Sequence, residues 1–293
     1  MNEFKTPKIN NPNKMKNFNG KVAVITGAGS GIGRALCLQL SDLGVKIVAA
    51  DFNKITLTET AEMIIQKGGE VFQQVVDVSK KEEVYAMKDA VLEKYGAADI
   101  VINNAGVGLG TLTVEEVTLE EIEWIFGINL WGVIYGTKAF LPHLKIRPEA
   151  AIVNISSVFG LIGVNNQSPY CMTKFAVRGL TESLRAEMLD SNVLVMQVHP
   201  GGIDTNIVRN SRQREEVTEA ETNTLISNFK QNARTTPEKA AKIIIKGLQK
   251  NKVRVLVGPD ACVFDWMTRF FPNWANRLFA KMSRNFEEKG KFF

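Results

Sequence analysis

The chain has 293 residues, of which 45% are hydrophobic and 23% are charged, as in an ordinary soluble globular protein. This composition excludes a disordered chain, a collagen and a disulfide-rich miniprotein. The net charge of +5 comes from the two ends of the chain, because residues 21–259 carry equal numbers of both signs. A nucleic-acid-binding protein is therefore not expected.

Two further classes are excluded by what the sequence lacks. No apolar run approaches the roughly 18 residues of a membrane span, and the polar first twenty residues have no apolar signal-peptide region. The three cysteines and two histidines lie far apart with no metal-ligand spacing, so we expect neither disulfides nor a bound metal. A reducing, cytoplasmic location fits these features best.

Residues 1–19 are rich in Asn, Lys and Pro, and we interpret them as a flexible N-terminal tail. From Gly20 onward, short β-branched runs alternate with segments of helical period. Buried strands separated by helices predict a parallel sheet between helical layers, which is a three-layer α/β fold. The predicted strands are Val22–Thr26, Lys46–Ala50, Val71–Val75, Ile100–Ile102, Ile152–Ile155, Val193–Val198 and Val253–Val257.

No linker or repeat divides residues 20–258, which we predict to form a single domain. Its least regular part is the polar stretch 204–235, which ends where Thr236 caps a helix that begins at Pro237. A long excursion before the last helix and strand predicts a lid over the site. A solvated helical insertion is the alternative.

A glycine-rich turn, Thr26 to Gly33, follows the first strand and opens an apolar helix. Glycines let a backbone approach a pyrophosphate, and a helix N-terminus offers it N–H groups and a positive dipole. Asp51 ends the second strand, where a carboxylate can bind an adenosine ribose and repel a 2′-phosphate. NAD is therefore expected over NADP, although Asp51 can instead cap the helix that begins near Ile55 or simply end a strand, and Arg34 or Lys54 can reach a phosphate.

Tyr170 and Lys174 lie four residues apart on a predicted helix and so share one face. An ammonium close to a phenol is expected to lower the phenolic pKa toward working pH, as a general acid/base for an alcohol or carbonyl requires. Ser157 follows the fifth strand, thirteen residues before Tyr170, where its hydroxyl can hold a substrate oxygen. That interval favours Ser157 over its neighbour Ser156.

Together these residues resemble the short-chain dehydrogenase/reductase family, and the match runs from about Lys21 to Val257. Its matching points are Thr26-Gly27, Gly31-Ile32-Gly33, Asp77-Val78, Asn103 to Gly106, Asn129, Ser157, Tyr170, Lys174, Pro200-Gly201 and Thr205. The resemblance implies a doubly wound Rossmann fold with a seven-stranded parallel sheet and a nicotinamide cofactor. It also implies metal-free interconversion of an alcohol and a carbonyl, and association into homodimers or homotetramers through helices near 119–141 and 170–190.

The resemblance also implies roles for single residues. Tyr170 exchanges a proton with the substrate oxygen, Ser157 orients that oxygen, and Lys174 lowers the tyrosine pKa and binds the nicotinamide ribose. Asn129 is the fourth catalytic residue and holds a water that links Lys174 to solvent. The cofactor-binding residues besides Tyr170 and Lys174 are Gly27, Ser30, Gly31, Ile32, Gly33, Asp51, Asp77, Val78, Asn104, Ala105, Gly106, Pro200, Gly201, Ile203 and Thr205.

Two features depart from the common family pattern. His199 precedes Pro200, and we interpret it as structural, with ligand contact as the alternative. Residues 259–293 form an amphipathic, basic C-terminal extension interrupted by Pro272. Three interpretations remain open for it, namely packing on the body or on a second subunit, cover for an apolar pocket, and contact with an anionic membrane.

The sequence thus predicts an NAD-preferring oxidoreductase that acts on a small, fairly apolar alcohol or carbonyl compound. A non-catalytic dinucleotide-binding sensor and a peripheral membrane protein are the two rival interpretations. The intact set of Ser157, Tyr170 and Lys174 argues against the sensor.

Overall fold

The computed structural model describes Met15, residues 17–204, 207, 211, 212 and 227, and residues 235–288, with only the backbone of 282–288. Most of the predicted N-terminal tail and of the predicted lid at 204–235 lies outside the described residues. So does the end of the C-terminal extension.

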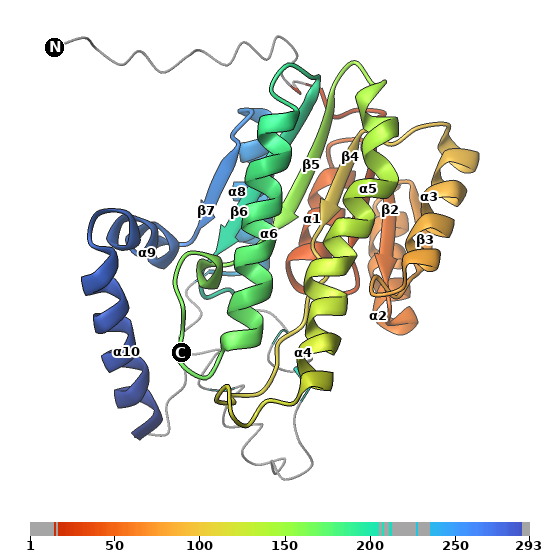
Figure 1. The fold of residues 1–293 in the computed structure, drawn as a ribbon. Helices are drawn as coiled ribbons and strands as arrows, with labels where there is room; N and C mark the ends of the chain where they lie inside the picture. Colours follow the sequence, from red (N-terminus) through yellow and green to blue (C-terminus); the bar gives the residue numbers. More distant parts are fainter. Residues whose placement is uncertain are drawn as a thin grey trace, which may run out of the picture.

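A seven-stranded parallel sheet forms the centre of the molecule, with the strand order β3-β2-β1-β4-β5-β6-β7 (Figure 1). All six neighbouring pairs run parallel, which confirms the predicted doubly wound sheet. The strands are β1 (Val22–Thr26), β2 (Lys46–Asp51), β3 (Val71–Val75), β4 (Ile100–Asn103), β5 (Ala150–Ile155), β6 (Val193–Pro200) and β7 (Arg254–Val257).

Helices cover both faces of the sheet, because alternate strand residues point to opposite sides. Ile25 faces one apolar core, which it shares with α1 (Gly31–Ser41), α2 (Lys54–Gln66) and α8 (Pro237–Gln249). Val24 faces the other core, under α3 (Lys81–Tyr95), α5 (Gly132–Lys145) and α6 (Ser168–Glu187). This arrangement confirms the three-layer α/β class.

Met15 and Phe18 belong to the first of these cores, with 1% and 4% of their surface exposed. Sequence analysis placed both in the flexible tail, because two isolated apolar side chains give no periodic signal. They pack under the layer of α1 and α8, so the ordered chain begins before Gly20.

The predicted helix 119–141 is present as an unbroken helical run over residues 119–145, but it is not α-helical throughout. It consists of α4 (Leu119–Phe126), the π-helical turn η1 (Gly127–Trp131) and α5. A capping box between Thr118 and Glu121 fixes the start of α4. Single π-helical turns inside α-helices are frequent at functional sites, and this turn carries Asn129.

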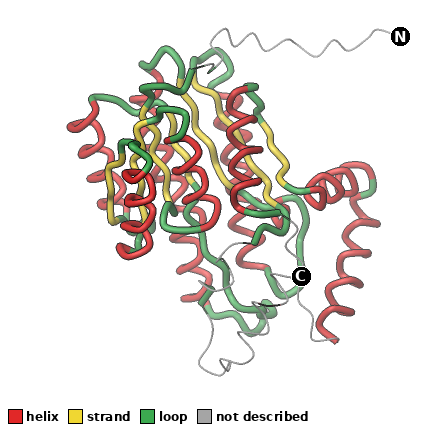
Figure 2. The backbone as a smooth tube through the Cα atoms, turned by 180° about the vertical axis from the view of Figure 1, so that it is seen from behind, coloured by secondary structure: helices red, strands yellow, loops and turns green. Residues whose placement is uncertain are grey.

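The C-terminal extension forms two helices beyond β7, α9 (Pro259–Phe270) and α10 (Pro272–Glu288), which stand outside the three layers (Figure 2). The break between them follows from Pro272, since the residue before a proline avoids helical backbone angles. Met267 and Phe279 of the extension pack against Ile162 and Val164, in the segment between β5 and α6. That segment begins with the short 3-10 helix η2 (Val158–Gly160).

Candidate active site

The predicted site residues gather where the strands end, along the lower edge of the sheet in Figure 1. The strand order reverses between β1 and β4, and in open parallel sheets the crevice at such a switch point is where ligands bind. The ends of β1, β2, β4, β5 and β6 each contribute residues to this edge.

The glycine-rich turn between β1 and α1 is too tight for any other residue at two positions. A Cβ at Gly33 would lie 2.0 Å from the Gly27 carbonyl oxygen, and Gly27 itself has φ +67°, in the left-handed region. Ser30 is the N-cap of α1, and its hydroxyl makes no capping hydrogen bond. The first N–H groups of α1 therefore lack a side-chain cap, and together with the glycines of the turn they form a cradle that fits a pyrophosphate.

Thr26 ties the glycine turn to the end of β4. Its hydroxyl oxygen accepts hydrogen bonds from the backbone N–H groups of Asn104 and Ala105, both at 3.0 Å. The Asn104 side chain returns a hydrogen bond of 2.8 Å to the Thr26 carbonyl oxygen. Sequence analysis quoted Thr26 as part of the motif without assigning it this role.

Asp51 lies at the end of β2 and faces the same turn. Its carboxylate accepts hydrogen bonds of 2.8 Å from the backbone N–H groups of Gly29 and Asn53. The alternative that Asp51 caps α2 is wrong, because Asn53 is the N-cap and accepts from the first turn of the helix. Arg34 is engaged by α2 as well, with an ion pair of 2.7 Å to Glu59 and a hydrogen bond to Thr60.

Asp77 and Val78 follow β3. The Asp77 carboxylate accepts hydrogen bonds from the backbone and hydroxyl of Ser79, at 3.0 and 2.7 Å, and so closes its own turn. Val78 packs on Gly132 at the start of α5, where a Cβ would come within 2.9 Å of it. The pair lies beside Asp51 at the end of the sheet, since Val75 is in register with that residue.

Asn129 locks the loop that follows β4. Its side-chain oxygen accepts from the Val107 N–H at 2.8 Å, and its amide donates to the Val107 carbonyl oxygen at 2.9 Å. Gly106 lies between Asn129 and Lys174, because a Cβ there would be 3.2 Å from the Asn129 oxygen and 3.4 Å from Lys174 Nζ. The structure thus brings Gly106, Asn129 and Lys174 together.

Ser157, Tyr170 and Lys174 meet above the end of β5. Lys174 Nζ lies 5.5 Å from the centre of the Tyr170 ring and donates a hydrogen bond of 3.2 Å to the Ile155 carbonyl oxygen. A hydrogen bond connects the hydroxyls of Tyr170 and Ser157. The neighbouring Ser156 is turned away and donates to the backbone of α6 at the Lys174 carbonyl.

The pKa values of Tyr170 and Lys174 differ from what the sequence led us to expect. Burial raises the pKa of Tyr170 to about 12, and the Ser157 hydrogen bond offsets only part of that rise. Burial also lowers the pKa of Lys174 to about 8. The expected lowering of the tyrosine pKa is therefore not seen in the protein alone, where the loss of water around the phenol has the largest effect.

The turn after β6 is braced by the C-terminal extension. Asp260, in the first turn of α9, accepts a hydrogen bond of 2.6 Å from the Gly202 N–H. A Cβ at Gly201 would lie 2.0 Å from the same carboxylate, so a larger residue there would displace the Asp260 side chain. Ile203 is buried, and Thr205 lies outside the described residues. Sequence analysis missed Asp260, for which an acidic residue in a first helical turn was the signal.

His199, at the end of β6, is fully buried and contacts the backbone of Ser157. Its Nδ1 lies 2.9 Å from the Ser157 carbonyl oxygen, and since a carbonyl only accepts, Nδ1 carries the proton. Burial, with Arg254 and Arg178 nearby, lowers the pKa of His199 to about 4. His199 is therefore neutral at pH 7 and fixes the backbone of Ser157.

His199 makes the free energy of unfolding depend on pH. Below pH 6.5 the unfolded chain takes up a proton that the folded protein excludes until about pH 4, so stability falls as the pH drops through this window. His199→Asn, which keeps a donor near the Nδ1 position, should lose roughly 3 kcal/mol less between pH 7 and pH 4 than the parent does. Urea unfolding of both proteins measures this, and equal losses would contradict it.

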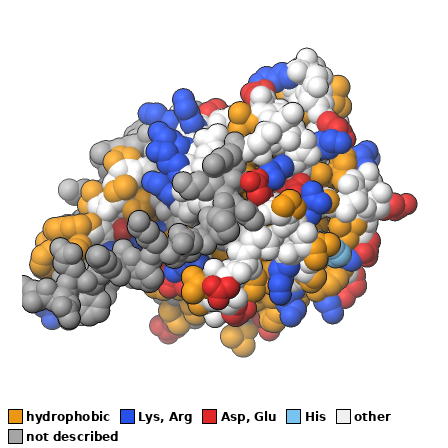
Figure 3. Space-filling model, turned by 90° about the horizontal axis from the view of Figure 1, so that it is seen from above, with side chains coloured by type: hydrophobic (Ala, Val, Ile, Leu, Met, Phe, Trp, Pro, Cys, Tyr) orange, Lys and Arg blue, Asp and Glu red, His pale blue; other side chains and the backbone are white. Residues whose placement is uncertain are grey.

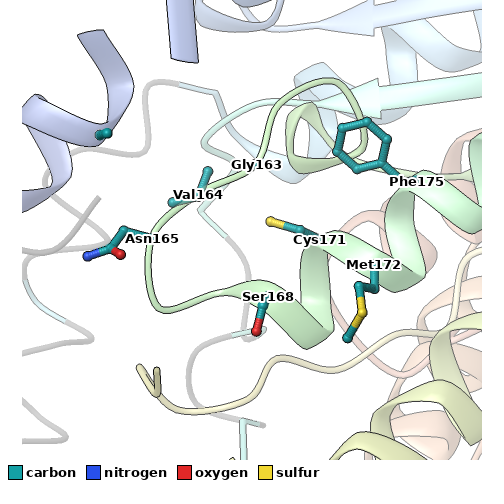
Figure 4. A pocket seen from close by; sticks show the side chains of 8 residues that line it. Gly163, Val164, Asn165, Ser168, Cys171, Met172 and Phe175 are labelled. Carbon is teal, nitrogen blue, oxygen red and sulfur yellow. The ribbon is translucent and has the colours of Figure 1, made fainter. Parts of the chain in front are cut away.

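A pocket of about 420 Å³ opens beside this site (Figure 4). It is formed by the loop before α6, the first turns of α6 and one residue of α10. The side chains of Cys171 and Phe175 line it from α6, on the helix that also carries Tyr170 and Lys174. The full lining is Gly163, Val164, Asn165, Ser168, Cys171, Met172, Phe175 and Ala280.

Among the residues that the structure describes, no group of three or more His, Cys, Asp and Glu side chains is arranged to hold a metal ion. Within the same residues, no helix has the length and apolar character needed to cross a bilayer.

Comparison with known proteins identifies the family. A family model described as short chain dehydrogenase matches residues 21–216. SadH, an oxidoreductase of Mycobacterium tuberculosis, is 43% identical over 270 residues, which cover 91% of this chain and 96% of SadH. Cyclohexanol dehydrogenase of an Acinetobacter strain is 34% identical over 200 residues, covering 68% of this chain and 80% of that enzyme.

A solved structure agrees with these relatives. The crystal structure of a short-chain dehydrogenase/reductase from Burkholderia phymatum in complex with NAD superimposes with a TM-score of 0.80 at 30% identity, covering 87% of this chain and 95% of that one. The chain therefore belongs to the short-chain dehydrogenase/reductase family of oxidoreductases.

Proposed function

We propose that the protein is an NAD-preferring oxidoreductase that interconverts an alcohol and a carbonyl group, with Tyr170 as the acid/base. The observation that carries the proposal is that Ser157, Tyr170 and Lys174 come together at the end of β5, one strand away from the switch point between β1 and β4. The naming of one relative as a cyclohexanol dehydrogenase supports an alcohol substrate.

The glycine cradle, with Asp51 beside it, fits a nicotinamide dinucleotide, which when bound supplies or accepts the hydride. Ser157 and Tyr170 hold the substrate oxygen between two hydroxyls. Because the pKa of Tyr170 is high, its phenol keeps its proton at neutral pH and can donate it to a carbonyl oxygen as negative charge develops there. Lys174, charged below about pH 8, stabilises the resulting phenolate.

An apolar substrate is supported by the surroundings of Tyr170. The rings of Tyr170 and Phe159 are nearly perpendicular, in an edge-to-face contact with their centres 5.9 Å apart. The ring also adjoins an apolar cluster built around Leu109, Val117 and Ile125.

A screen of cyclic and long-chain alcohols with NAD, and of the matching ketones with NADH, tests the activity. No turnover of any of them, with NADH still bound, would favour the rival dinucleotide sensor.

The preference for NAD is part of the proposal. Asp51 presents a carboxylate at the end of β2, whereas the nearby Arg34 is held by Glu59 and Thr60 of α2. A 2′-phosphate at this point would meet the like charge of Asp51, while the Arg34 guanidinium is held by its partners on α2.

Asp51→Ala should shift the ratio of kcat/KM for NAD and NADP toward NADP by roughly tenfold to several hundredfold, because it removes both the ribose acceptor and the repelling charge. Glu59→Ala removes the ion pair of Arg34 without touching Asp51, and because Thr56 and Thr60 still hold the guanidinium it should raise NADP use by much less. Steady-state kinetics with both cofactors measure the ratios. A parent protein that already prefers NADP would overturn this assignment.

Location and assembly complete the proposal. Free cysteines at Cys37, Cys171 and Cys262 suit a reducing cytoplasm. Homo-oligomers built on α5 and α6 are supported by apolar side chains that these helices leave partly in water. They are Trp131, at the junction with α5, and Met172 and Phe175 of α6.

A further inference from the structure

An aromatic patch covers the outer side of the junction between α9 and α10. Trp266, Phe270, Phe271 and Trp274 are each between 49% and 63% exposed. Their rings form a chain, in which Trp266 lies 5.6 Å from both Phe270 and Phe271, and Phe271 lies 6.4 Å from Trp274. Hydrophobic side chains gather at this end of the molecule in Figure 3, to the left, where α9 lies.

The apolar side chains on the inner side of the same two helices are already buried against the rest of the domain. Met267 and Phe279 fill the cluster with Ile162. The acidic groups of α9 also point inward, since Asp260 accepts from the Gly202 N–H and Asp265 pairs with Arg254 of β7. The aromatic patch is therefore surplus to the packing of the extension, and large contiguous apolar patches mark interaction surfaces.

Positive charge continues the patch along α10. Arg277 and Lys281 lie three and seven residues after Trp274, which puts all three side chains on one exposed face. Arg269 of α9 is engaged by Asp265, at 2.9 Å. The outward face thus joins four aromatic rings to two exposed cations, with the described acidic groups of the extension turned away from it.

We propose that this face docks on the surface of an anionic lipid bilayer. Trp and Phe side chains favour the boundary between headgroups and acyl chains, and Lys or Arg beside them is attracted to negatively charged lipid. A second copy of the chain fits less well, because a twofold contact through this face would bring the cations of both copies together. The contact is peripheral, and both helices stay outside the hydrocarbon core.

Co-sedimentation of the full chain with vesicles tests the proposal. Binding is expected to vesicles of phosphatidylcholine mixed with phosphatidylglycerol, and only weakly to phosphatidylcholine alone. The double variant Arg277→Glu/Lys281→Glu should bind the anionic vesicles at least about 30-fold more weakly. Lys242→Glu/Lys246→Glu makes the same change in net charge at exposed positions on α8 and should bind like the parent.

A second variant examines the aromatic half of the patch. Trp266→Ser/Trp274→Ser should weaken vesicle binding while NADH affinity, a measure of folding remote from the patch, stays unchanged. Equal binding to neutral and anionic vesicles, or no effect of the Arg277/Lys281 variant, would overturn the proposal. So would a light-scattering mass that falls to a single chain in the tryptophan variant, since the patch would then join two copies.

Discussion

Tyr170→Phe should lower kcat by two to four orders of magnitude, the usual effect of removing a general acid/base. The phenylalanine ring keeps the edge-on contact with Phe159, so the apolar surroundings are preserved. Only the hydroxyl that bonds Ser157, and that we propose as the proton donor, is lost. NADH affinity should stay close to that of the parent, because the glycine cradle and Asp51 are untouched.

Tyr135→Phe is the matched control. It removes the same hydroxyl from a tyrosine of α5 that stacks on Trp131, outside the site. Stopped-flow or steady-state kinetics with the best alcohol or ketone from the screen compare the two. If Tyr170→Phe keeps activity within tenfold of the parent, while Tyr135→Phe does the same, Tyr170 is not the acid/base.

The parts of the fold that rest on local pattern could be predicted from the sequence. All seven strands lie within two residues of their predicted bounds, because buried parallel strands read as short β-branched runs. The glycine turn could be predicted for a similar reason, since Gly27 and Gly33 occupy positions where backbone geometry admits no side chain. The position of Asp51 at the end of the second strand could be predicted in the same way.

What escaped prediction depends on contacts between distant parts of the chain. Asp260 braces the Gly201-Gly202 turn from 58 residues away, and His199 holds the Ser157 backbone across 42 residues. The direction of the Tyr170 pKa shift also depends on how deeply the finished fold buries the ring. Helical spacing alone showed that Lys174 is close and could not show that burial would raise the pKa of the phenol.

The largest expected effect on stability concerns the C-terminal extension. Removing residues 272–293 takes away α10, and with it the contact between Phe279 and Phe264, whose ring centres are 4.6 Å apart. Ile162, Met267 and Phe279 form one buried cluster, and uncovering large apolar side chains costs about 2 kcal/mol each. A loss of several kcal/mol is a large fraction of the 5–15 kcal/mol typical of a folded domain. Thermal unfolding of the shortened chain measures it.

The kinetics of two shortened chains distinguish two roles of the C-terminal extension, namely covering the substrate pocket and only stabilising the fold. Without α10 the pocket beside α6 loses its Ala280 wall, so KM should rise more for long apolar substrates than for small polar ones, while NAD affinity is unaltered. Removing residues 260–293 also deletes Asp260 and Asp265, and kcat should then fall for every substrate, because the Gly201-Gly202 turn loses its brace. Equal losses across substrates of graded chain length in the first truncation would contradict pocket cover. The extension would then act on the site only through α9, by way of the hydrogen bond from Gly202 to Asp260.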